Sequence, residues 1–212
     1  EYDNPFTAGI YATGSSNQPV ALTIELIGEN TITGNYGIFL NAEISASSYG
    51  TNATLTITGE NNGSLGVSGS DHGIYVKSGS GDAYLNIKNV AVTSSTNGNY
   101  SAGVYVHSST GATNSPLLSI AVNGGSLTAS GGTSSDGILF NVESSQATGA
   151  TTSLTVSDNA IVRANGGIKA SSVDEPTPSG TGIVFDGTEG TVYGNVTLQE
   201  DLEISEGESL TI

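Results

Sequence analysis

The sequence predicts an all-β protein, a parallel β-helix (solenoid) of about six coils with three strands each. Two observations support this fold class. The first is that a short run beginning with glycine recurs along the chain, and two further strand-like segments follow most of its copies in the same order. The second is that no long stretch shows the 3.6-residue periodicity of a helix. A fixed order of three strands is what a parallel β-helix needs, because each strand then stacks on its counterpart one coil later.

The first strand set consists of runs in which glycine precedes an apolar residue and, in most copies, an aromatic or aliphatic one. The runs begin at Gly9, Gly37, Gly73, Gly103, Gly137, Gly167 and Gly182. By subtraction, the first six start 28, 36, 30, 34 and 30 residues apart, and the seventh follows 15 residues later. Self-similarity at this period indicates a repeat architecture.

Two further strand sets lie between these runs. The second set comprises residues 21–24, 54–57, 84–87, 117–120 and 153–156, and the third comprises 31–33, 64–67, 90–92, 126–129 and 161–164. Most alternate apolar and polar residues with a period of two, as half-buried strands do. We expect the Leu and Ile side chains to form the core and the Thr, Ser and Asn side chains to face outward. An antiparallel sandwich is an alternative, although it does not require a fixed order of three strands.

The whole chain, residues 1–212, is expected to form one solenoid domain. Residues 171–181 are predicted to be a long loop, because Pro176 and Pro178 cannot donate to a sheet ladder. Residues 191–212 are predicted to form a last, uncapped coil. Since solenoids need capping repeats to stay soluble, we expect the chain to be a segment of a longer protein.

The composition excludes several classes of function. The chain has 20 Asp and Glu residues against 4 Lys and Arg, a formal net charge of −16. Such a surface repels nucleic acid, because it cannot replace the counterions of the phosphates. The absence of Cys excludes disulfides and thiolate metal sites. No apolar stretch approaches the roughly 18 residues of a membrane helix, so no membrane insertion is expected within these residues.

Several strings resemble the degenerate repeats of right-handed parallel β-helix proteins of the pectate-lyase-like superfamily. They are Gly-Ile-Tyr-Val at 73–76, Ser-Leu-Thr-Ala-Ser-Gly-Gly at 126–132 and Gly-Gly-Ile-Lys-Ala at 166–170. The stretch 202–212 is similar to repeats of large secreted or wall-attached bacterial proteins. The resemblance extends over essentially the whole chain and implies a right-handed coil and a secreted or cell-surface location in a bacterium. Repeats of this kind specify a fold better than an activity.

The resemblance also raises the possibility of polysaccharide cleavage, for which the sequence offers little. Lyases of this superfamily use an Arg-type base with Ca²⁺ held by clustered Asp, and hydrolases use Asp groups with His and Arg-x-Lys. The single Arg163 is not followed by Lys two residues later, and alignment with Thr128 predicts that it points outward. Asp71-His72-Gly73 is only faintly similar to the Gly-His-Gly element of the hydrolases. We therefore expect no catalytic residues.

Metal binding is also weakly indicated. His72 and His107 are offset by five positions if the coils stack in register, which makes them a poor metal pair, and two solvated histidines are expected. The acidic residues near the C-terminus could hold Ca²⁺ through oxygen ligands, but a solvated acidic face is the favoured interpretation. These residues are Glu200, Asp201, Glu203, Glu206 and Glu208. No cofactor is predicted.

An outward stripe of aromatic residues is the most specific feature. If Ile10, Ile38, Ile74, Val104 and Ile138 face the core, the residues after them face outward: Tyr11, Phe39, Tyr75, Tyr105 and Leu139. They should stack about 4.8 Å apart and form an exposed ribbon. Two positions further on lies a polar ladder of Thr13, Asn41, Lys77, His107 and Asn141. Aromatic faces beside polar groups suit sugar rings, so these residues form a candidate glycan-binding site. Structural filling of the sheet surface and a protein contact are the alternatives.

The leading hypothesis is a non-enzymatic spacer of an exported bacterial surface protein with a glycan-binding or adhesive face. Its expected partners are a glycan or a host or matrix surface protein. The second hypothesis is an active or degenerate relative of polysaccharide lyases or glycoside hydrolases, which requires carboxylates and basic residues to converge in one groove. A third is a fragment of a secreted passenger domain.

Overall fold

The computed structural model describes residues 7–14, 18–42, 51–109, 115–143, 149–198 and 201–212. These parts contain strands and no helix, and therefore no helix that could cross a membrane. The strands are β1 (Ala8–Thr13), β2 (Val20–Asn41), β3 (Thr51–Thr96), β4 (Val104–Ser109), β5 (Leu117–Ser130), β6 (Ile138–Val142), β7 (Thr151–Asn165), β8 (Ile168–Ser171), β9 (Ser179–Asp186), β10 (Glu189–Tyr193) and β11 (Ser209–Thr211).

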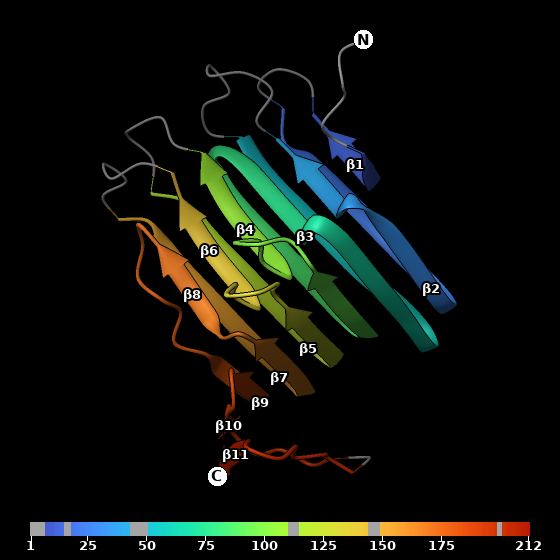
Figure 1. Ribbon diagram of the computed structural model, residues 1–212, viewed down its shortest axis with the longest axis vertical. Helices are drawn as coiled ribbons and strands as arrows, with labels where there is room; N and C mark the ends of the chain where they lie inside the picture. Colours follow the sequence, from blue (N-terminus) through green and yellow to red (C-terminus); the bar gives the residue numbers. More distant parts are fainter. Residues whose placement is uncertain (1–6, 15–17, 43–50, 110–114, 144–148, 199–200) are drawn as a thin grey trace.

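The chain winds as a parallel β-solenoid, which confirms the predicted fold class (Figure 1). β2 and β3 each contain segments of all three strand sets in one continuous strand that bends at the corners. Their pairing is parallel in every set, with Leu22 opposite Leu55, Ile32 opposite Val67 and Ile38 opposite Ile74. Stacking of like segments therefore produces three sheets, which we call the first, second and third sheets after the strand sets that form them.

The number of turns is smaller than predicted. About four turns are present instead of six coils. The seventh run, which begins at Gly182, does not join the first sheet. Ile183 lies opposite Ile161 and Phe185 opposite Arg163, so this segment of β9 extends the third sheet. The run beginning at Gly167 is the last strand of the first sheet, with Ile168 opposite Ile138.

The core is a narrow column of aliphatic side chains inside the three sheets. Each sheet contributes rows of fully buried residues, such as Ile74, Leu85 and Leu127. The alternation along the strands places every second residue inside, as the sequence predicted. Removal of these side chains from water is the main favourable contribution to folding.

The corner between the second and third sheets is sharp because residues there adopt left-handed backbone conformations. Asn89, Gly124, Asp158 and Asn159 all have positive φ angles between 52° and 64°. Asn, Asp and Gly accept this region more readily than other residues. The chain can therefore pass from one sheet to the next with almost no loop.

The C-terminal part departs from the prediction of a last coil over residues 191–212. β10 runs antiparallel to β9, with Gly190 opposite Phe185, and β11 then pairs parallel to β10. The chain thus turns back after β9 and does not continue the parallel winding. The preceding connection is shorter than the predicted loop 171–181, since β8 ends at Ser171 and β9 begins at Ser179.

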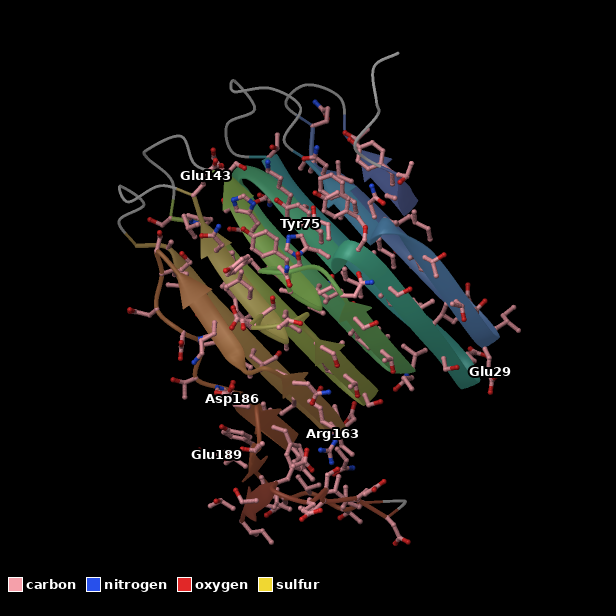
Figure 2. The ribbon with its side chains drawn as sticks, in the orientation of Figure 1. Glu29, Tyr75, Glu143, Arg163, Asp186 and Glu189 are labelled. Carbon is pink, nitrogen blue, oxygen red and sulfur yellow. The ribbon has the colours of Figure 1, made fainter. Side chains whose placement is uncertain are left out.

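Arg163 fixes the C-terminal segment to the outer surface of the third sheet (Figure 2). Its Nη1 donates to Oε1 of Glu208 at 2.7 Å, and its Nη2 donates to the carbonyl of Glu203 at 2.5 Å. Its guanidinium lies 3.9 Å from the centroid of the Phe185 ring, which is fully buried although it is on the outer side of the sheet. Glu208 is therefore paired and half-buried, which corrects the expectation of a wholly solvated acidic face.

Truncation of a core residue should destabilise the solenoid strongly. Leu85→Ala is expected to lower the free energy of unfolding by about 2–5 kcal/mol, because it leaves a cavity inside the column. Urea unfolding followed by circular dichroism measures the change. Lys88→Ala, at an exposed position of the same strand, is the control and should change stability by less than about 0.5 kcal/mol. Equal effects of the two variants would contradict the assigned core.

Removal of the Arg163 charge should release the C-terminal segment without unfolding the solenoid. In Arg163→Gln, amides of residues 203–208 are expected to exchange hydrogen faster, as measured by mass spectrometry. A hydrogen bond from the Ser205 amide and the contact with Arg163 lower the pKa of Glu208 below its ordinary value of 4.5. The stabilisation is therefore present above pH 4.5 and lost as the pH falls through the folded-state pKa. Lys169→Gln, which breaks the exposed pair with Glu175, should leave this segment unchanged.

Candidate functional site

The predicted aromatic stripe is in register on the first sheet. Tyr11 pairs with Phe39, Phe39 with Tyr75, Tyr75 with Tyr105, and Tyr105 with Leu139. The ring centroids of Phe39 and Tyr75 are 4.7 Å apart and those of Tyr75 and Tyr105 are 4.8 Å apart, both as stacked pairs. Tyr11 and Phe39 are tilted at 5.4 Å. We call Tyr11, Phe39, Tyr75 and Tyr105 the ring ladder. Lys169 lies opposite Leu139 in the next strand and ends the stripe.

The ring ladder is less exposed than the sequence suggested. Phe39 and Tyr75 are only 5% and 8% exposed, whereas Tyr11 is 51% exposed and Tyr105 is half-buried. The rings do not belong to the aliphatic core, so they lie outside the sheet and are buried largely against one another. Tyr75 lies in the middle of this surface (Figure 2). The expectation of a fully exposed ribbon is therefore wrong for its two central rings.

A second row of rings, which the sequence analysis missed, flanks the ladder. Tyr36 and His72 pair with each other at the start of the first sheet. The Tyr36 ring lies 4.9 Å from Phe39, and the His72 ring lies 4.6 Å from Tyr105. Strict alternation from Ile38 would place residue 36 inside, but the pairing register shifts between Gly34 and Tyr36. An irregularity of this kind at a corner is not visible in the apolar pattern.

The predicted polar ladder also stacks in register and binds the rings. Thr13, Asn41, Lys77, His107 and Asn141 occupy paired positions on successive strands. The Tyr75 hydroxyl is hydrogen-bonded to Nδ1 of His107 at 2.7 Å, and the Asn141 amide donates to the Tyr105 hydroxyl at 2.7 Å. Burial raises the pKa of Tyr105. His107 is buried, with Nε2 3.8 Å from the carboxylate of Glu143.

His72 lies in an environment that favours its neutral form. The Ala102 amide donates to Nδ1 of His72 at 3.0 Å, which assigns the ring proton to Nε2, 3.7 Å from Oδ1 of Asp71. Burial lowers the pKa of His72, and the nearby Asp71 carboxylate only partly opposes this effect. Tyr36 is hydrogen-bonded to the Asp71 carboxylate. Burial, together with this hydrogen bond, raises the pKa of the Tyr36 hydroxyl. The expected solvated histidines are thus both buried.

The described residues do not assemble a metal centre. His107 lies opposite Lys77, which is five residues after His72 in the neighbouring strand. The two histidines are therefore offset by five positions, as predicted. No group of three His, Asp or Glu residues that could hold a metal occurs among the described residues, which include Asp201, Glu203 and Glu206 but not Glu200. Arg163 and Lys169 lie in separate ion pairs, with Glu208 and Glu175.

Comparison of the chain with protein-family models, with curated proteins and with solved structures found no match. What the arrangement can do therefore follows from its geometry. A partly exposed row of rings, bordered by amide and ammonium groups, offers apolar faces and hydrogen-bonding partners side by side. Such a surface can bind a ligand that has both apolar faces and hydroxyl groups.

The depressed pKa of His72 should make stability depend on pH. Below pH 6.5 the unfolded chain binds a proton that folded His72 does not, so the free energy of unfolding should fall as the pH drops from 6.5 towards the folded-state pKa. An NMR titration of the imidazole should show a midpoint below 6.5. In His72→Gln this part of the pH dependence should disappear from the urea unfolding curves. A midpoint above 6.5 would contradict the assignment of a buried neutral ring.

Proposed function

We propose that the chain is a non-enzymatic module of an exported bacterial surface protein, a rigid spacer that presents a glycan-binding face. One observation carries the proposal. The ring ladder and the polar ladder stack in register on the same outer surface of the first sheet. The solenoid therefore displays one row of rings and one row of hydrogen-bonding groups along its axis.

The chemistry of this surface supports a glycan as the ligand. Tyr11 and Tyr105 retain exposed ring surface, and Leu139 extends the apolar row beyond them. Sugar rings stack through their C–H faces on aromatic rings and use their hydroxyls for hydrogen bonds. Asn41, Lys77 and Asn141 lie next to the rings and are half-buried, so each retains some surface accessible to a ligand.

The spacer role rests on the continuity of the parallel stack. Each coil hydrogen-bonds to the next along all three sheets, and the coils advance by about 4.8 Å. Solenoids of this kind are stabilised by contacts between neighbouring repeats, which makes them stiff along the axis. The buried central rings contribute to this stiffness, because each stacked pair adds about 0.5–1.5 kcal/mol beyond its buried area.

Kinship with the pectate-lyase-like superfamily and a location outside the bacterial cell are part of this proposal. They are supported by the parallel solenoid and by the repeat strings at 73–76, 126–132 and 166–170. The alternative of a lyase or hydrolase relative receives less support, since Arg163 is held by Glu208 on the third sheet, away from the rings. A protein ligand on host or matrix surfaces remains the competing partner in the experiment below.

Replacement of the two most accessible rings should abolish glycan binding. A glycan array probed with the wild type is expected to give a reproducible set of bound sugars, and Tyr11→Ala combined with Tyr105→Ala should lose them. These two rings are chosen because Phe39 and Tyr75 are buried. Tyr84→Ala on the second sheet is the matched control and should bind as the wild type does. Binding to matrix proteins but to no glycan would contradict the glycan-binding role.

A further inference from the structure

The corner between the third and first sheets carries two shallow, open surface grooves that the proposed function does not use. The first groove extends over three successive segments of the third sheet, and the second over the next two. Hydroxyl and amide side chains line the first groove: Thr33, Ser68, Ser70, Ser95, Thr96 and Asn97. The second contains Ser134, Ser135 and Asn165 with one carboxylate, that of Asp136.

The turn Asn97–Ser101 separates the two grooves. On one side, the Asn97 amide donates to the carbonyl of Gly69, which lines the first groove. On the other side, the Gly132 amide donates to the Ser101 carbonyl, and the Ser101 amide donates to Oγ of Ser135. Gly132 and Ser135 both line the second groove. The turn and the two grooves therefore form one continuous surface that follows the solenoid axis.

An aromatic ring is displayed at the tip of this turn. The Tyr100 side chain is 87% exposed, and its backbone is left-handed with a φ of 62°. Ser134 has the corresponding place in the following turn and the same conformation, with a φ of 58°. The turn therefore requires a positive φ, for which glycine or asparagine is the usual residue and a bulky side chain is unfavourable. Neither the turn geometry nor burial favours a tyrosine at this position.

We propose that Tyr100 and its two flanking grooves form a second binding site, for an uncharged oligosaccharide that lies along the solenoid axis. The lining repeats at about the 4.8 Å step between coils, which suits an extended polymer with a regular unit. Its hydroxyl and amide groups match sugar hydroxyls, and the Tyr100 ring offers a stacking face. The net charge of −16 disfavours anionic polymers such as uronates. The site lies at the corner that precedes the first sheet, and none of its residues belongs to the ring ladder.

The test uses the whole chain with four probes: cellohexaose, xylohexaose, mannohexaose and, as the anionic comparison, hexagalacturonate. Amide NMR spectra locate binding and isothermal titration calorimetry measures affinity. At least one uncharged probe is expected to shift the amides of residues 97–101 and of both grooves. Tyr100→Asn should weaken that binding about tenfold, a typical cost of losing one ring contact.

The variants are chosen so that loss of folding cannot imitate loss of the site. Asparagine accepts a positive φ, so Tyr100→Asn should keep a melting temperature at or above that of the wild type. Tyr100→Phe keeps the ring and should bind within about twofold of the wild type, because stacking does not need the hydroxyl. Ser172→Asn introduces asparagine at another exposed position with a positive φ (61°), outside both grooves and without removing a ring, and should leave binding unchanged.

Three results would overturn the proposal: no shift around Tyr100 with any uncharged probe, wild-type affinity in Tyr100→Asn, or tighter binding of hexagalacturonate. Shifts confined to the ring ladder would reject this site and leave the proposed function standing. Conversely, Tyr11→Ala combined with Tyr105→Ala should leave the shifts around Tyr100 in place. The two proposals can therefore fail separately.

Discussion

Parallel, in-register hydrogen bonding between successive coils is the constraint on which the rest of the structure depends. Each backbone segment pairs with its counterpart one coil away, so equivalent residues lie directly over one another. A side chain that recurs in the repeat therefore becomes a row of side chains along the axis. The aliphatic core, the ring ladder and the polar ladder are all consequences of this one arrangement.

The same constraint explains the buried hydroxyls at the corners. Where the chain leaves one sheet for the next, some carbonyls point away from the ladder and need other partners. Ser78 donates to the Gly81 carbonyl and Ser94 to the Gly103 carbonyl, each at 2.6 Å, and both serines are fully buried. Small hydroxyl side chains satisfy these carbonyls without enlarging the narrow interior. The abundance of Ser and Thr in this chain is thus partly structural.

The outer surfaces show that pointing away from the core does not mean exposure to solvent. Phe39 and Tyr75 lie outside the aliphatic column but are buried, because rings only 4.7–4.8 Å apart cover one another's faces. Phe185 is buried on the outer side of the third sheet beneath Arg163. The ladder therefore combines a stabilising role at its centre with accessible rings at Tyr11 and Tyr105.

By itself the sequence determined the fold class, the three strand sets and the facing of most residues, because alternation and the recurring glycine runs depend only on local pattern. It also placed the ring and polar ladders in the correct register. The strand sets 84–87 and 117–120 place Leu118 opposite Leu85, whereas Leu85 in fact pairs with Ile120. A register shift of two residues keeps every side chain on the same face of the sheet, so the apolar pattern could not reveal it. Tertiary structure alone decided that Gly182 begins a third-sheet segment, that Tyr36 and His72 join the rings, and that Arg163 meets Glu208, 45 residues away. These outcomes depend on corner irregularities and on the path of the chain after Ser171, and neither leaves a periodic signal in the sequence.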